Sequence, residues 1–324
     1  TRYIGDWSSD VCSSDLRNTD VEWWGAGVYG GPYLDRFEII DYGTEMVASV
    51  SAVESDEVDI LWQSTGDFIQ ILDDIGWTKS ESVTGQTVVF RPQQVAEVDG
   101  AQPYADARVR RALAMAIDNA VILELGYAGL GSVAENHHVA PIHPEYAELA
   151  PVVHDPAAAM ALMEEAGMAD FEHELISIDD TWRKNTSDAA AAMLRDAGIN
   201  VTRTILPGST FWNDWSGYPL STTAWAQRPL GVQVLALSYR SGEAWNESAF
   251  SNAEFDALLA EAMAIADADA RREVMAKLQK IMQDEGVVVQ PYWRSIYRHH
   301  APNVVGAEMH PTFEIHVAKL GFAA

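Results

Sequence analysis

The chain has 324 residues, 48% of them hydrophobic and 21% charged, a composition typical of a globular protein large enough for two lobes. Its 48 acidic and 21 basic residues give a formal net charge of -27, and this field repels nucleic acid and anionic lipid head groups, which argues against nucleic-acid binding. The sequence contains no run of eighteen apolar residues that could span a membrane. Its single cysteine, Cys12, excludes an intramolecular disulfide bond.

The first residues of the chain differ in character from the rest. Residues 4–16, which read IGDWSSDVCSSDL, resemble a translated sequencing adapter. We therefore interpret residues 1–16 as a non-native leader and leave them out of the fold prediction, as one leaves out an expression tag. The chain also begins without Met or a signal peptide, which we interpret as a sequence that starts inside a gene.

A glycine-rich stretch in residues 21–40 separates an aromatic segment from a predicted strand whose pattern includes Phe37 and Ile39. A phosphate-binding loop is the functional alternative for these glycines. That mechanism needs a following helix that starts with Lys and Ser or Thr, and the sequence has none at this place. We therefore predict a structural turn.

Three further elements are expected before the first strongly amphipathic helix. Residues 44–53 are predicted to form a helix, and residues 57–61, which read EVDIL, a strand. Residues 83–92 carry β-prone Thr, Val and Phe side chains and end at a proline, which predicts a second strand.

The clearest amphipathic pattern of the chain lies within residues 103–131. Its apolar positions recur at helical spacing and are Val109, Leu113, Ala116 and Ile117. Asp106 is the expected N-cap of this helix, and Asp118 is the expected N-cap of a second, shorter helix.

Three histidines, His137, His138 and His143, lie close together in residues 136–146, which read NHHVAPIHPEY. Imidazoles are common metal ligands, so a metal-carrier function is one interpretation of this segment. Two prolines predict an irregular loop, however, and the spacing matches no H-E-x-x-H or Cys/His template. We therefore predict no metal ligand set.

Residues 155–206 show a helix, strand, helix, strand order. The Asp-Pro pair at residues 155–156 is a favourable helix start, with a capping side chain followed by a proline in the first turn. A strand over residues 172–178, a helix over residues 183–197 and a strand over residues 199–206 then form a β-α-β unit. This order predicts parallel strands joined by a right-handed crossover.

The last third of the chain is predicted to be mainly helical. A strand over residues 222–226 leads into a polar and aromatic loop, after which Ser251 and Glu254 form a capping box. Two helices broken near residues 267–269 follow, and a buried strand is expected over residues 287–289.

Several blocks of the sequence match one family in the same order. Residues 106–118, DARVRRALAMAID, fit the block D-x-R-V-R-x-A-L-x-x-A-I-D. The others include GGPYLD in residues 30–35, EVDI in residues 57–60 and DPAAAMALMEEAGM in residues 155–168. By these blocks the chain resembles the family 5 extracellular solute-binding proteins, which are the peptide-binding, nickel-binding and related receptors of bacterial ABC importers.

The resemblance implies an α/β, two-lobed periplasmic-binding-protein fold of type II. Residues 17–92 then form part of the first lobe, residues 93–286 form the second lobe, and residues 287–324 return to the first. The two crossings between lobes make a hinge. The N-terminal portion typical of the family is missing from the chain, so we expect an incomplete first lobe.

The resemblance also implies a function that needs no chemistry and no cofactor. Such a receptor captures a solute, by default a peptide, outside the cytoplasmic membrane by closing its hinge. It then delivers the solute to an ABC transporter permease in the inner membrane. We expect a monomer that is periplasmic or otherwise extracytoplasmic and membrane-associated.

The resemblance places ligand residues in both lobes. Residues that follow the strand at 57–61 face the cleft in relatives, and the strand at 222–226 resembles the one that carries the family's W-x-x-D motif. The polar and aromatic loop after that strand adds further candidates. The predicted ligand residues are Trp62, Gln63, Trp225, Gln227, Arg228, Tyr239, Trp245 and Asn246.

One position departs from the family pattern. In dipeptide receptors the acid of the W-x-x-D motif holds the free amino group of the ligand, but here Trp225 is followed by Ala226, Gln227 and Arg228. An arginine repels an ammonium group and favours a carboxylate or phosphate. An anionic or non-peptide solute, or a metal chelate, is therefore the alternative ligand, and a surface ion pair is the structural alternative for Arg228.

An enzyme, most plausibly a hydrolase, is the hypothesis from another class. The sequence contains no G-x-S-x-G elbow and no H-E-x-x-H motif, and its single cysteine lies in the leader. Asp179 and Asp180 form an acidic pair, but adjacent residues diverge on a strand and are typical of a turn. We therefore predict a binding protein.

Overall fold

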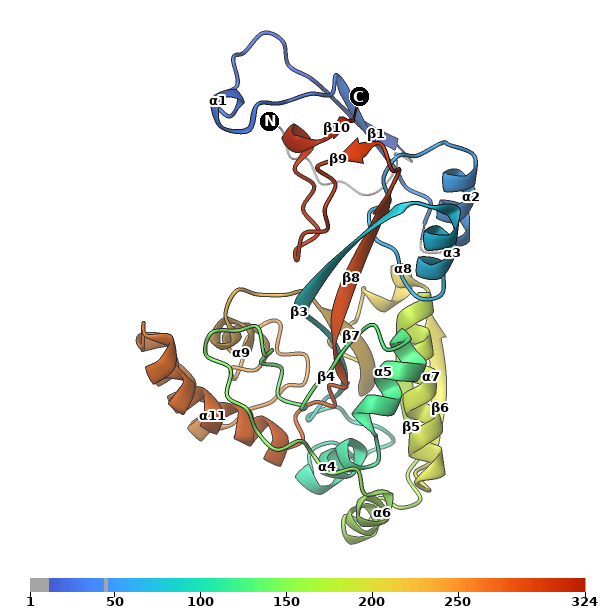
Figure 1. Cartoon of the computed structure of the whole chain (residues 1–324). Helices are drawn as coiled ribbons and strands as arrows, with labels where there is room; N and C mark the ends of the chain where they lie inside the picture. The colour runs from blue at the N-terminus through green and yellow to red at the C-terminus, as the bar shows by residue number, and fades with distance from the viewer. Residues whose placement is uncertain (1–11, 44–45, 324) are drawn as a thin grey trace. The chain divides into compact units, whose positions relative to one another are not determined.

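The computed structural model describes residues 12–43 and 46–323, and it divides into two compact units (Figure 1). The larger unit spans Val83–Ser295. The smaller unit consists of the described residues up to Ser82 together with those from Ile296 onward.

The chain passes between the two units twice, each time within a strand. Strand β3 (Thr78–Pro92) makes the first passage and strand β8 (Tyr292–His300) makes the second. The two strands are neighbours in one sheet. The unit boundaries thus fall inside strands, whereas the expected boundaries, at residues 93 and 287, lie outside them.

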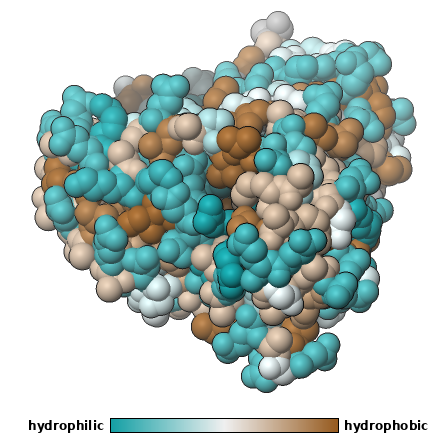
Figure 2. All heavy atoms as spheres, turned by 90° about the horizontal axis from the view of Figure 1, so that it is seen from below, coloured by the Kyte–Doolittle hydropathy of each residue, from teal (hydrophilic) through white to brown (hydrophobic). Residues whose placement is uncertain are grey.

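The surface is rich in polar and charged side chains. On the face drawn in Figure 2, hydrophilic residues are spread widely and apolar residues form small groups between them. Among the described residues, no helix is both long and apolar enough to cross a bilayer.

The larger unit is built on a six-stranded mixed sheet in the order β4-β8-β3-β7-β5-β6. Its other strands are β4 (Gly131–Val133), β5 (His173–Ile178), β6 (Val201–Leu206) and β7 (Leu220–Trp225). Strand β5 pairs in parallel with both β6 and β7, whereas β3 is antiparallel to β7. The parallel pair β5–β6, joined by α7 (Thr181–Asp196), confirms the predicted β-α-β unit.

Strand β3 is buried on both faces within the larger unit. Val88 and Phe90 belong to one hydrophobic cluster and Val89 to another, because successive side chains of a strand point to opposite faces. Figure 1 shows α5 and α7 on one side of the sheet and α9 and α11 on the other. The continuous apolar run of this strand therefore supplies two cores.

The first core is organised by the helix that the sequence pattern predicted. Helix α4 (Ala107–Met115) begins at Asp106, whose side chain accepts a 2.8 Å hydrogen bond from the Arg108 N–H. Helix α5 (Asn119–Tyr127) begins at Asp118, which accepts from the Ala120 N–H at 2.9 Å. Both predicted caps are confirmed.

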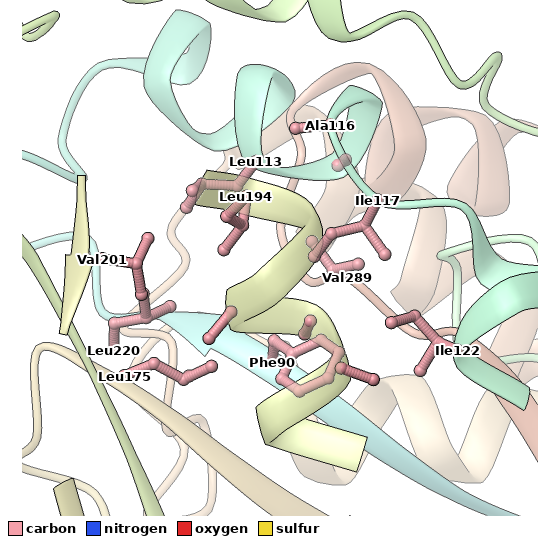
Figure 3. Packing of buried hydrophobic residues seen from close by; sticks show 14 of the residues in the cluster. Phe90, Leu113, Ala116, Ile117, Ile122, Leu175, Leu194, Val201, Leu220 and Val289 are labelled. Atoms are coloured by element: carbon pink, nitrogen blue, oxygen red, sulfur yellow. The ribbon is translucent and has the colours of Figure 1, made fainter. Parts of the chain in front are cut away.

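The apolar face of α4 packs against the sheet and α7. Figure 3 shows Leu113 beside Leu194 and Ile117 beside Val289, with Phe90 of β3 nearby. These side chains line a cavity of only about 10 Å³, so the core is close-packed. Full burial of each large apolar side chain contributes about 1.5–3 kcal/mol to stability.

The second core lies between the sheet and three C-terminal helices, α9 (Gly231–Ser238), α10 (Ala253–Ala264) and α11 (Ala268–Asp284). The break between α10 and α11 confirms the prediction near residues 267–269. Helices α6 (Pro156–Glu165) and α8 (Gly208–Phe211) complete the larger unit. Asp155 caps α6, as predicted, by accepting from the Ala158 N–H at 2.9 Å.

Two local predictions in the larger unit are wrong. Helix α10 is capped by Asn252, whose side chain accepts from the Phe255 N–H at 3.0 Å, whereas the Ser251 hydroxyl bonds to the Ser241 hydroxyl at 3.1 Å. Residues 287–289 are buried but make only an isolated bridge from Val289 to β3 instead of a strand. An apolar run shows burial but not regular pairing.

The smaller unit contains short elements. They are β1 (Cys12–Leu16), α1 (Ala26–Tyr29), β2 (Arg36–Ile40), α2 (Met46–Glu54), α3 (Phe68–Ile75), β9 (Val304–Val305), a 3₁₀ turn (Val317–Lys319) and β10 (Gly321–Phe322). Strand β1, which belongs to the segment left out of the fold prediction, pairs antiparallel with β2. The predicted strand at residues 57–61 is wrong, because only Ile60 forms a bridge, with His300.

Candidate functional site

The candidate site in the larger unit is built around the end of β7. Thr223 and Trp225 point to the same face of the strand, since they are two residues apart. The Thr223 hydroxyl and the Trp225 Nε1–H donate to Oε1 of Glu247 at 2.6 and 2.7 Å. An acid therefore lies against Trp225, although it comes from a loop 22 residues later in the chain rather than from the motif position.

Glu247 is buried and paired with Arg91 of β3. The Arg91 Nε–H donates to Oε2 of Glu247 at 3.0 Å, and Nη1–H donates to the Glu247 carbonyl at 2.7 Å. Burial raises the pKa of Glu247, while the Arg91 charge and three hydrogen bonds oppose that shift. The carboxylate is fully engaged, so it positions Trp225 and the 245–250 loop and is not free for a ligand.

Gln227 and Arg228 follow β7 and differ in how far they are engaged. Oε1 of Gln227 accepts from the Gly85 N–H of β3 at 2.9 Å. The Arg228 guanidinium is half-buried and donates to the carbonyls of Ala226 and Gln227 at 3.1 Å. Within the described part of the chain, no carboxylate forms an ion pair with Arg228, so the surface ion pair considered for it is not formed there.

Tyr239 lies in the interior, against a histidine of the loop at residues 136–146. Its hydroxyl and Nδ1 of His138 share a 2.6 Å hydrogen bond, and the His138 ring packs edge-on against Trp225 at 5.6 Å. Burial lowers the pKa of His138 to about 3, so the ring is neutral at physiological pH. Tyr239 therefore holds the His138 ring, which packs against the indole of Trp225.

Trp245 and Asn246 lie side by side in the loop after α9 but play different parts. Trp245 is 47% exposed and packs against Trp225 with ring centroids 6.0 Å apart. Asn246 donates to the Phe250 and Arg240 carbonyls at 2.7 and 3.1 Å and accepts from the Phe250 N–H at 3.1 Å. Asn246 thus holds the loop, and Trp245 presents an apolar surface.

The other loop histidines are also engaged with protein groups. Nδ1 of His143 accepts from the Ala140 N–H at 2.9 Å, and Nε2 lies 3.1 Å from the Arg228 carbonyl, to which it donates in the matching tautomer. His137 is buried, and its pKa is lowered to about 3 by burial. Among the described residues these histidines do not belong to a group of three potential metal ligands.

Two predicted ligand residues lie in the smaller unit. Trp62 is 57% exposed and stacks on Phe313 with ring centroids 5.8 Å apart. Nε2 of Gln63 is buried without a hydrogen-bond partner among the described residues. An unpaired buried amide group is costly to stability.

A Ser-His-Asp network in the smaller unit bears on the enzyme hypothesis. Nδ1 of His299 lies 2.9 Å from the Ser64 hydroxyl, and Nε2 lies 3.1 Å from Asp73. Burial raises the pKa of Asp73, but hydrogen bonds from Lys79 and His299 outweigh it and lower the pKa. Ser64 is fully buried, so no substrate reaches its hydroxyl and the network is structural.

One surface hollow of the larger unit is lined by other residues. It has a volume of about 430 Å³ and is lined by Leu149, Glu254, Ala276, Lys277, Lys280 and Ile281 of the larger unit. None of the predicted ligand residues contributes to it.

A family model of the bacterial extracellular solute-binding proteins, family 5, matches residues 15–247, which is more than half of the chain. The chain belongs to this family. Family 5 proteins are solute-binding receptors rather than enzymes, and the match confirms the family that the sequence blocks indicated.

Several solved structures share the fold of this chain at low sequence identity. The oligopeptide-binding protein AppA from Bacillus subtilis, solved with a nonapeptide, superposes with a TM-score of 0.80 at 17% identity over 98% of this chain. The substrate-binding domain of an oligopeptide ABC transporter from Bacillus anthracis gives 0.80 at 18% over 99%. NikA from Staphylococcus aureus, solved with Ni(L-His)2, gives 0.76 at 15% over 88%.

The family 5 chain is shorter than these proteins. It spans 65% of AppA, 64% of the Bacillus anthracis domain and 61% of NikA. No protein with curated function matches the chain. The predicted α/β periplasmic-binding-protein fold is confirmed, whereas the expected incompleteness of the first lobe and the ligand residues stay predictions.

Proposed function

We propose that this protein is the extracytoplasmic solute-binding receptor of an ABC importer and that its solute is a peptide. Membership of family 5 carries the receptor role, and the likeness to two oligopeptide-binding proteins supports the peptide. The receptor acts as a periplasmic monomer that delivers its solute to a permease in the inner membrane.

The binding step follows from differential affinity. A solute that contacts both lobes stabilises the closed state, because those contacts are complete only when the hinge has closed. The two strands that join the units, β3 and β8, supply the hinge in this proposal. No covalent step is needed.

We assign direct ligand contacts to the predicted residues that the protein leaves incompletely engaged. These are Trp245 and Arg228 in the larger unit and Trp62 and Gln63 in the smaller unit. Trp245 and Trp62 are the exposed aromatic surfaces, and Nε2 of Gln63 is an unsatisfied donor. The other four predicted residues, Trp225, Gln227, Tyr239 and Asn246, support Trp245 and Arg228 within the larger unit through their internal hydrogen bonds.

Arg228 decides how a peptide is oriented. Its guanidinium has no carboxylate partner among the described residues, and it suits a carboxylate better than an ammonium group. We therefore propose that Arg228 binds the carboxyl end of the peptide. The same observation favours one alternative, an anionic solute that is not a peptide.

Native mass spectrometry of the gently purified protein tests the proposal. A set of bound masses spaced by amino-acid residues supports a peptide receptor, and a single small acidic mass supports the anionic alternative. Calorimetric titration with a short peptide and with its carboxyl-terminal amide then tests Arg228. We expect the amide, and the Arg228→Ala variant, to bind at least tenfold more weakly; equal affinities would remove Arg228 from the site.

A further inference from the structure

A cluster of three potential metal ligands lies in the C-terminal part of the smaller unit. His310, Glu314 and His316 each offer one ligand atom, and these three atoms lie within 4.8 Å of one another. The two imidazole rings meet edge-on with centroids 5.5 Å apart. Among the described residues this is the group of three that meets such a criterion.

A threonine between these residues links two of the three ligands. The Thr312 hydroxyl lies 2.8 Å from Nδ1 of His310 and donates to Oε1 of Glu314 at 3.1 Å. When Nδ1–H of His310 donates to that hydroxyl, the lone pair of Nε2 is free, which is the tautomer that a metal-bound imidazole needs. The backbone N–H of Thr312 favours the opposite tautomer, but its 3.3 Å contact is longer.

The loop is held in place by a buried arginine that is not part of the cluster. Arg298 of β8 donates to the carbonyls of Glu308 at 3.1 Å and of Phe313 and Glu314 at 3.4 Å. Phe313 is also stacked on Trp62. An ion would therefore bind ligands whose backbone is already ordered, which reduces the entropic cost of binding.

The donor set selects a class of ion. Calcium and magnesium prefer six or more oxygen ligands or retained water, whereas two imidazoles and one carboxylate suit late first-row divalent metals. Donors on one tetrahedral zinc ion lie about 3.4 Å apart. Rotations of the exposed Glu314 and His316 side chains can close the difference from the observed spacing.

We propose that His310, Glu314 and His316 form a binding site for zinc or nickel, with water completing the coordination. The site goes beyond the solute-binding function and does not depend on it. The net charge of -27 favours cation binding by the protein as a whole, while Arg298 opposes it locally. A bound ion would cross-link residues 310–316 and stabilise the C-terminal part of the smaller unit.

Calorimetric titration of the untagged, chelator-treated and dialysed chain with zinc chloride and with nickel chloride tests the site. We expect one ion per chain and an affinity that falls about 100-fold or more in His310→Ala/His316→Ala. The matched control is His154→Ala, because His154 is similarly exposed and lies 3.9 Å from Asp118 but has no third ligand among the described residues. Cys12 is present in all samples, so any binding by its thiol cancels.

Further variants and two spectroscopic measurements keep the test decisive. Glu314→Gln preserves the size of the side chain and should also weaken metal binding. A folding defect of the double variant then cannot explain the loss of affinity. The circular dichroism spectra without metal should be the same for all variants. Cobalt substituted into the wild-type site should show the visible absorption of tetrahedral coordination, and Thr312→Val should weaken binding about tenfold. Equal affinity of wild type and both ligand variants, or no binding at all, would overturn the site.

Discussion

The two units bury their side chains in different ways. In the larger unit, alternate residues of β3 supply two extensive hydrophobic clusters on the two faces of one sheet. The smaller unit has clusters of a few residues, such as Val50, Val53, Leu61 and Leu72, and its strands β9 and β10 have two residues each. Polar contacts carry more of its structure, among them those of Arg298 and His299.

This difference predicts where stability resides. Burial of apolar area is the largest favourable term in folding, so the larger unit should unfold as the more stable body. The smaller unit should open first, because exposed aromatic side chains such as Trp24 and Tyr33 add nothing to its core. Four changes would break or sharpen this comparison.

The largest effect is expected from the buried ion pair of the larger unit. Glu247→Gln removes the charge that compensates Arg91, which is fully buried, and should lower the free energy of unfolding by about 3–5 kcal/mol. Urea denaturation followed by circular dichroism measures the loss. Glu243→Gln, which breaks the partly exposed pair with Arg240 in the same loop, should cost less than about 1 kcal/mol; equal losses would show that the pair is not buried in solution.

The next effect concerns the core against α4. Leu113→Ala should destabilise the larger unit by about 2–5 kcal/mol, because the closely packed neighbours cannot fill the space. Leu72→Ala makes the same change at a fully buried position of the smaller unit. Hydrogen exchange should show faster opening of the larger unit in the first variant and of the smaller unit only in the second. Loss of protection in both units in either variant would mean that they unfold together.

Acid should weaken the larger unit through its buried histidines. Burial lowers the pKa of His137 and of His138 to about 3, whereas an unfolded histidine titrates near pH ~6.5. The unfolded state therefore binds protons that the folded state does not bind. The free energy of unfolding consequently falls as the pH drops from about 6.5 towards 3. The loss is roughly 1 kcal/mol per histidine between about pH 7 and about pH 5.5.

Thermal melts at a series of pH values in the wild type, His138→Gln and His154→Gln measure this effect. The first variant should have a shallower dependence on pH, because the unfolded state has lost one of the protons that the folded state does not bind. His154→Gln, at an exposed position, controls for the substitution itself. An unchanged slope in His138→Gln would mean that this ring is protonated or accessible in the folded protein.

The smallest effect distinguishes two candidate caps of α10. Asn252→Ala removes the side chain that accepts from the Phe255 N–H and should cost about 1 kcal/mol, whereas Ser251→Ala should cost much less. The melting temperatures of the two variants provide the measurement. A larger loss in Ser251→Ala would restore the capping box that the sequence indicated.

Prediction from the sequence succeeded where the signal was local. Asp106, Asp118 and Asp155 were recognised as caps, because a short acidic side chain before an amphipathic run satisfies the first free N–H groups of a helix. It failed at residues 57–61 and 287–289, where each segment makes only a single isolated bridge to a strand. A strand forms only where a second segment pairs with it, and the residues of one segment do not show which segment that is.

The candidate site shows the same limit. Trp225 was recognised, and the acid after it was noted as absent, but the sequence does not show that Glu247 reaches the same indole from a later loop. His138 was considered as a metal ligand, whereas it packs beneath Trp225 and bonds Tyr239. Any sequence signal for the contact between Glu247 and Trp225 would have to lie in the loop that brings Glu247 back to β7.

By itself, the sequence determined the family, the α/β class, the capped helices and the strand at residues 83–92, because these depend on residues that are neighbours or follow a fixed period. Only the tertiary structure decided which polar groups are engaged by other groups of the protein and which are not. Arg91 and Glu247 neutralise each other inside the larger unit, while Arg228 has no carboxylate partner among the described residues. The reason is physical: a charge removed from water must be compensated by whatever the fold brings beside it, and that partner is set by packing across the chain.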